Sequence, residues 1–94
     1  MTFTFKSAPL SIRDARILKE RLEEALVRLC GPPRITNIPD FGDITRYSFL
    51  DNTQVEPQLI SRDKTEVYVQ VYTDAQIMRA DLAKELKALG IRKA

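Results

Sequence analysis

Two segments of the chain repeat apolar residues at spacings of three and four, the repeat that lines one face of an α-helix. The first segment runs from Ile12 to Leu29 and the second from Thr73 to Leu89. Ser11 and Thr73 are the candidate capping residues that open them, and a glycine follows each segment within two residues. We therefore predict two amphipathic helices, each with one buried stripe and one solvated face.

Other segments alternate polar and apolar residues or are rich in β-branched and aromatic residues, which is typical of β-strands. Pro57 lacks the amide hydrogen that an inner strand needs, so it favours an edge position or a bulge for its strand. The predicted strands are Thr2–Lys6, Ile44–Leu50, Val55–Ile60 and Thr65–Tyr72, and Arg34–Ile38 has the composition of a further edge strand.

The order of these elements predicts a single α+β domain over residues 1–94, in the order β-α-(β)-β-β-β-α. We expect two helices packed on one face of a three- to five-stranded antiparallel sheet. Val67, Val69 and Val71 alternate with Tyr68 and Tyr72, so the valines should face the helices and these tyrosines the open side of the sheet.

Composition limits the classes of protein that the chain can belong to. With 94 residues, 44% of them hydrophobic and 30% charged, the chain has material for one core and not for a multidomain enzyme or a membrane span. The single cysteine cannot form an internal disulfide, and no secretory signal opens the sequence. We expect a cytoplasmic protein.

The residue types in the sequence do not favour catalysis or metal binding. The chain has no histidine, which removes the commonest acid/base group at neutral pH and the commonest zinc ligand. Cys30 ends a predicted helix, where the helix dipole disfavours a thiolate. The acids Asp40, Asp43, Asp51 and Glu56 lie largely in turn-like sequence and lack the spacing of a calcium loop. We expect no enzyme activity, no cofactor and no metal.

Binding to a protein is the function that remains. We expect Tyr47, Tyr68, Tyr72 and Arg46 to form a partner surface on the open sheet face, with Arg62 and Lys64 at its rim. The partner is a protein or a second copy, bound through the open face or an unpaired edge strand. In size and lack of catalytic motifs the chain resembles the small inhibitors that phages and mobile elements encode, such as anti-CRISPR proteins.

Single-stranded nucleic acid is the alternative partner. Bases would stack on the three tyrosines while Arg46, Arg62 and Lys64 held the phosphates. The order helix, three strands, helix over Ile12–Leu89 also resembles double-stranded-RNA-binding domains, but an acid, Asp74, stands where that family carries phosphate-gripping bases. The formal net charge is only +2, which favours a protein partner.

Overall fold

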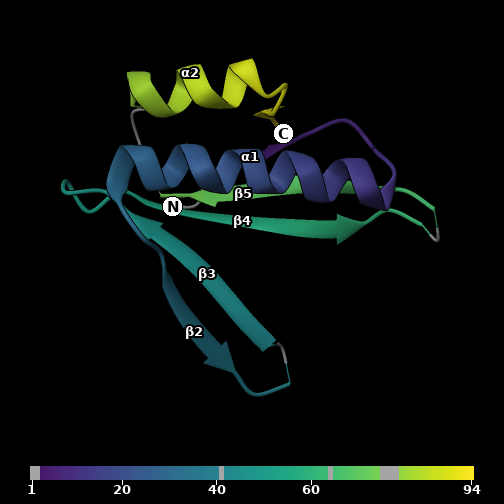
Figure 1. The fold of residues 1–94 in the computed structure, drawn as a ribbon, viewed down its shortest axis with the longest axis horizontal. Coiled ribbons are helices and arrows are strands. Elements are labelled where there is room, and N and C mark those ends of the chain that lie inside the picture. Colours follow the sequence, from purple (N-terminus) through teal and green to yellow (C-terminus); the bar gives the residue numbers. More distant parts are fainter. Residues whose placement is uncertain (1–2, 41, 64, 75–78) are drawn as a thin grey trace.

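The computed structural model describes residues 3–40, 42–63, 65–74 and 79–94, which form two helices and one antiparallel sheet (Figure 1). The sheet order is β2-β3-β4-β5-β1-β6, so the first strand pairs with the fifth at the centre of the body. The elements in chain order are β1 (Phe3–Lys6), α1 (Ile12–Cys30), β2 (Arg34–Ile38), β3 (Gly42–Ser48), β4 (Gln54–Ser61), β5 (Val67–Thr73), α2 (Ala80–Ala88) and β6 (Arg92–Lys93). The α+β class and the element order predicted from the sequence are confirmed.

Helix α1 begins and ends where local sequence chemistry directs. The Ser11 hydroxyl accepts a hydrogen bond from the Asp14 amide at 3.2 Å, which satisfies a backbone donor of the first turn. Gly31 follows the helix with a φ of 93°, a conformation that side chains rarely adopt, and its amide donates to the Val27 carbonyl. Both helix ends are therefore set by local capping interactions.

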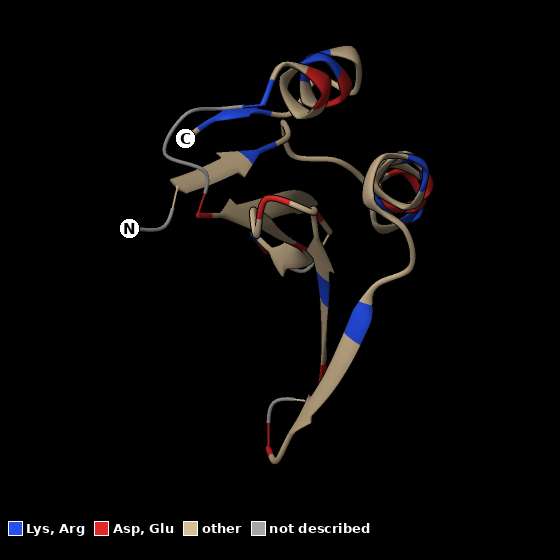
Figure 2. Cartoon of the chain, turned by 90° about the vertical axis from the view of Figure 1, so that its left-hand side faces the viewer, with Lys and Arg blue, Asp and Glu red and all other residues tan. Residues whose placement is uncertain are grey.

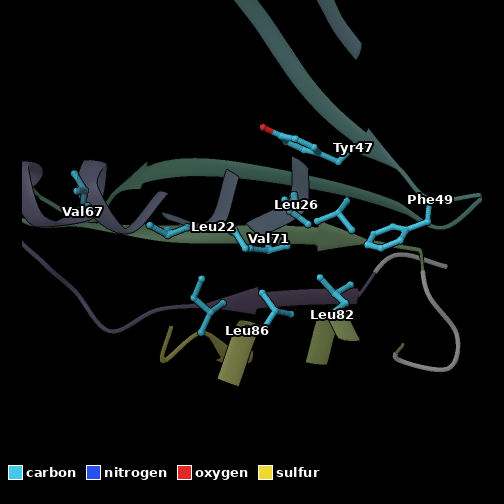
Figure 3. Packing of buried hydrophobic residues seen from close by; sticks show 12 residues of the cluster. Leu22, Leu26, Tyr47, Phe49, Val67, Val71, Leu82 and Leu86 are labelled. Atoms are coloured by element: carbon cyan, nitrogen blue, oxygen red, sulfur yellow. The ribbon is translucent and has the colours of Figure 1, made fainter. Parts of the chain in front are cut away.

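The core lies between the two helices and the valine side of β5, as Figure 3 shows. Val69 and Val71 are completely buried, and Leu22 and Leu26 of α1 pack against that face. Leu82 and Leu86 bring α2 into the same cluster. Both helices therefore cover one face of the sheet, as the alternation of β5 predicted.

The sheet has six strands, one more than the upper limit predicted. The additional strand is β6, a two-residue strand that pairs with β1 through Phe5↔Lys93 and Lys6↔Arg92. The Ala94 amide also donates to the Thr4 carbonyl at 2.9 Å. A strand of two residues is too short to produce an alternation in the sequence, which is why pattern alone did not predict it.

Helix α2 starts later than the sequence predicts. Thr73 is the last residue of β5, where it pairs with Val55 and with Phe3. Helix α2 begins at Ala80, so the prediction that Thr73 caps this helix is wrong. The residue that precedes α2 is Arg79, whose side chain does not cap the helix backbone. The other expected members of this first turn, Ala75, Gln76 and Met78, lie outside the described residues.

β2 and β3 form a two-stranded arm that leaves the body of the domain (Figure 1). The two strands pair from Arg34↔Arg46 to Ile38↔Gly42, whereas β3 pairs with β4 only through Tyr47↔Val55 and Ser48↔Gln54. We use "arm" for β2, the turn after it, and residues 42–46. The arm therefore shares its base with the sheet and, among the described residues, contributes none to the buried core.

Pro57 lies in an inner strand, since β4 is hydrogen-bonded between β3 and β5. The prediction that Pro57 places its strand at an edge of the sheet is therefore wrong for β4 as a whole. At Pro57 itself, however, one side of the strand has no partner strand close by among the described residues. The backbone of Val67 bonds to Leu10, and that of Val69 bonds to the amide and hydroxyl of Ser7, on the side of β5 that faces β1. By alternation, Pro57, which lies opposite Val71, has its nitrogen directed away from β5. On that side β3 has already separated, leaving a cleft of about 360 Å³ lined in part by Pro57 and Thr45. The missing amide hydrogen therefore costs no ladder bond.

Within the described residues, neither helix is long and apolar enough to cross a membrane.

Candidate protein-interaction surface

The side of the sheet opposite the helices carries an uncovered surface, which we call the open face. Its residues follow from strand register, because directly paired residues point to the same side. Glu56 pairs with Tyr72, Gln58 with Gln70 and Ile60 with Tyr68, and all six side chains are partly exposed. The neighbouring strands add Thr4, Lys6, Arg46 and Ser48, and β6 adds Arg92, which pairs with Lys6.

Tyr68 and Tyr72 lie on this open face, as the sequence predicts. Both are half-buried. Four residues of an extended strand separate them by about 13 Å, with Gln70 between. The Lys6 ammonium lies 5.7 Å from the centre of the Tyr68 ring, so this ring already has a cation partner.

Lys6 belongs to the surface although we did not single it out from the sequence. The signal was present, because Phe3 and Phe5 alternate with Thr4 and Lys6. Once the phenylalanines are placed on the helix side, Lys6 must point to the other.

Arg46 is exposed on the open face, where its guanidinium lies 3.6 Å from Glu56. Glu56 also accepts a hydrogen bond from the Gln58 amide at 3.3 Å. Beside this group is a hollow of about 120 Å³, lined by Arg46, Glu56, Tyr72 and Asp74 among others. Ligand pockets usually exceed about 300 Å³. This hollow is smaller than that, and its size suits a single side chain of a partner.

Tyr47 does not belong to the open face, so the prediction that placed it there is wrong. Its ring is only 2% exposed and packs in the core (Figure 3). It pairs with Val55, whose side chain faces the helices, and its hydroxyl donates to the Glu23 carboxylate of α1 at 3.2 Å. Burial, followed by the nearby Glu23 charge, raises the pKa of Tyr47 to about 12.

Arg62 lies in the turn between β4 and β5, at the Tyr68 end of the open face. Its guanidinium lies 3.6 Å from Glu66, and its side chain is largely solvated. The turn is held by Asp63, which accepts hydrogen bonds from the amides of Thr65 and Glu66. These bonds lower the pKa of Asp63. Lys64, the other expected rim residue, lies outside the described residues.

Cys30 packs at the end of α1 against the core. Its thiol lies 3.0 Å from the Leu26 carbonyl, and burial raises its pKa, which disfavours the reactive thiolate. Across the described parts of the chain, no three Cys, Asp or Glu side chains gather in a way that could hold a metal ion. Asp51 acts as a turn residue, accepting from the Thr53 amide at 3.0 Å.

Comparison with known proteins gives a fold likeness alone. No family model and no curated protein matches the sequence. Among solved structures, the open form of the exocytosis-sensitive phosphoprotein pp63/parafusin (phosphoglucomutase) from Paramecium is similar, with a TM-score of 0.52 and 15% identity. The likeness covers 93% of this chain but 19% of that one, so this chain spans about a fifth of that protein's length. At this identity the similarity concerns the arrangement of helices and strands.

Proposed function

We propose that this protein is a non-catalytic module that binds a partner protein on the open face of its sheet. The observation that carries the proposal is that both helices cover one side of β5, while Tyr68 and Tyr72 remain partly exposed on the other. Tyrosine is enriched at protein interfaces because it combines a large apolar ring with a hydroxyl that can hydrogen-bond.

The electrostatics of the open face support a protein rather than a nucleic acid as the partner. The cations of this face are Lys6, Arg46 and Arg92, the last of which pairs with Lys6 between β1 and β6. Glu56 offsets one of them by ion pairing with Arg46. Nucleic-acid sites need several uncompensated cations, because affinity comes largely from releasing counterions at the phosphates. A mixed-charge face with two aromatic anchors is typical of a protein interface.

We further propose that binding regulates the partner, as an inhibitor of a larger assembly does, and that it takes place in the cytoplasm. The free thiol of Cys30 supports a reducing compartment. The small size of the domain and the raised pKa of its thiol support action by binding rather than by catalysis.

The test is quantitative capture of partner proteins from the native cell by the wild-type chain and by a Tyr68→Ala, Tyr72→Ala double variant. Ile17→Ala is the matched control, because Ile17 is an exposed apolar residue of α1 on the opposite side of the molecule. We expect proteins retained by wild type and control to be lost from the double variant, with melting temperatures nearly unchanged.

Equal capture by all three proteins would contradict the proposal, as would a large fall in melting temperature for the double variant. Retention on single-stranded nucleic acid that falls steeply with salt, and that requires the same tyrosines, would replace the protein partner with the alternative.

A further inference from the structure

β2 ends the sheet order, and its outer edge pairs with no strand of the described residues. The opposite edge of the sheet is formed by β6, which has only two residues, whereas β2 has five. Short edge strands limit unwanted pairing, and long ones are templates for another strand. β2 is therefore the edge of this sheet that is able to accept a further strand.

The register identifies which backbone groups this edge presents. The Phe49 amide donates to the Thr53 carbonyl of the following segment, so odd-numbered residues of β3 direct their backbone groups toward β4. Even-numbered residues of β3 then face β2, where Arg46 pairs with Arg34 and Ile44 with Thr36. By the same alternation, the groups of Ile35 and Asn37 point outward.

Prolines limit this edge at both ends. Pro33 and Pro39 flank β2. Like Ile35 and Asn37 they are odd-numbered, so in an extended chain their nitrogens would also face outward, but proline has no amide hydrogen to donate. The edge therefore offers the amides and carbonyls of two residues, enough for a short antiparallel pairing. A longer pairing along this edge would lack hydrogen bonds at the two prolines.

The arm exposes apolar surface as well as backbone. Ile35 is 63% exposed, and four of the five residues of β2 are exposed. An isolated two-stranded hairpin is marginally stable in water. Pairing that covered Ile35 would stabilise the arm.

The arm carries its positive charges at its base and its negative charges toward its tip. Figure 2 shows blue segments where the arm leaves the body and red segments toward its tip. The basic residues are Arg34 and Arg46, and the acidic residues are Asp40 and Asp43. Arg34 and Asp40 form no side-chain hydrogen bond or ion pair with another described residue. Two arms laid side by side in opposite directions place the basic base of each beside the acidic tip of the other.

We propose that the occupant of this edge is a second copy of the chain, paired antiparallel through β2 about a two-fold axis. A two-fold contact is self-complementary, so each favourable pair occurs twice. Pairing Ile35 with Asn37 of the second copy satisfies all four outward backbone groups of each strand. That register brings the base of each arm, where Arg34 lies, toward the turn of the second copy, where Asp40 follows β2.

Charge reversal tests the proposal. Arg34→Asp leaves an acid on each side of the β2 edge, and Asp40→Arg leaves a base on each side, while Arg46 and Asp43 on β3 are unchanged. Each variant alone should dimerise at least about tenfold more weakly than wild type, because two attractive contacts become repulsive. An equimolar mixture of the two should form a heterodimer, in which both contacts are again attractive.

Light scattering and sedimentation equilibrium from about 10 μM to about 1 mM measure the mass, a range suited to a small interface. Wild type that stays monomeric throughout overturns the proposal, as do single reversals that dimerise like wild type. A mixture that fails to associate overturns it as well.

Ile35→Pro provides a second test that does not depend on charge. It removes an outward amide hydrogen while leaving the β2–β3 ladder intact, so it should abolish dimers with little change in the amide spectrum of the body. Ile35→Val keeps the amide and is the matched control. Persistent dimers in Ile35→Pro would refute strand pairing at β2. Because these changes leave Tyr68 and Tyr72 in place, loss of dimers and loss of partner capture are separate outcomes.

Discussion

The hydroxyl of Tyr47 joins the base of the arm to the side of α1. It donates to one oxygen of Glu23 at 3.2 Å, and the other oxygen lies 2.9 Å from the Lys19 ammonium. The carboxylate is thus shared between a phenol from the sheet and a lysine one turn earlier on the helix. Ionising the phenol would place two negative charges together, which contributes to the raised pKa of Tyr47.

This raised pKa predicts a loss of stability in alkali. The folded pKa of about 12 lies above the ordinary value of 10.0, so the stabilisation is fully present below about pH 10. It is then lost as the pH rises toward 12. Urea unfolding at a series of alkaline pH values should show a falling free energy of unfolding in wild type.

Tyr47→Phe is the matched control, since it keeps the buried ring and removes the titrating hydroxyl. The variant should be less stable at neutral pH by about 0.5 to 1.5 kcal/mol, the usual net value of one hydrogen bond. Its stability should fall less between pH 10 and 12. Parallel curves for the two proteins would show that the Tyr47 hydroxyl is not the titrating group.

The different fates of the tyrosines show what alternation can predict. In β5 the three valines are all at odd-numbered positions and therefore face one side of the sheet. The sequence alone thus predicts that Tyr68 and Tyr72 face the other side. In β3 the apolar residues have mixed parity, because Ile44 belongs to the exposed arm while Tyr47 belongs to the core. No single pattern describes a strand that leaves the body halfway along, and the sequence therefore could not place Tyr47.

At the scale of elements, Arg79 fixes the start of α2 against the turn between β3 and β4. Its guanidinium lies 4.2 Å from the centre of the Phe49 ring and 2.7 Å from Asp51. It also forms two hydrogen bonds with Asp81, both of 3.1 Å. A side chain from outside the helix thus holds its first turn, in place of the cap that Thr73 was expected to supply.

We predict that Arg79→Met lowers the melting temperature at neutral pH, because it keeps apolar contact with Phe49 but removes both carboxylate contacts. Hydrogen bonds from Thr53, with a smaller contribution from Arg79, lower the pKa of Asp51, and the bond from Arg79 is the main cause that lowers the pKa of Asp81. A lowered folded pKa means stabilisation that is present above about pH 4 and lost as the pH falls below it.

Thermal melts of wild type and Arg79→Met from neutral pH to about pH 2.5 measure this effect, a range that spans the carboxyl titration. The difference in melting temperature should shrink below about pH 4. Arg79→Lys keeps the charge but not the planar two-bond geometry, so it should lie between the two proteins. A difference that stays constant across the acid range would rule out the carboxylates as its source.

Element boundaries were predictable where one local interaction decides them. The serine cap and the glycine end of α1 needed no information from the rest of the fold, and the predicted span differs from the observed helix by one residue. The capping pattern at Thr73 did not mark the start of α2, which begins at Ala80, and Thr73 instead ends β5, paired with two neighbouring strands. Asp74 extends the strand connection by accepting a hydrogen bond from the Gln54 amide at 2.8 Å.

At the scale of the molecule, the domain divides into a packed body and an unpacked arm. The core cluster draws residues from α1, α2, β4, β5 and the last part of β3, and none from β2 or residues 42–46. Burial supplies most of the free energy of folding, so the body should not need the arm to fold. This division was not predictable, because the composition of Arg34–Ile38 suits an edge strand of the body equally well.

A shortened chain tests this division. Arg34 and Arg46 are directly paired at the base of the arm, so an Asn-Gly turn that replaces residues 35–45 can join them as a two-residue hairpin loop. We expect the amide spectrum of residues 54–61 and 67–73 to be retained and the melting temperature to change by a few degrees. Loss of dispersed amide signals would show that the body depends on the arm.

The shortened chain also separates the two surfaces. It lacks the β2 edge, so it should remain monomeric at concentrations where the full chain forms dimers. It keeps Tyr68, Tyr72 and Lys6, so it should capture the same partner proteins as the full chain. If capture is lost together with the dimer while the body stays folded, the partner binds either the arm or the dimer, and the open face alone is not sufficient for docking.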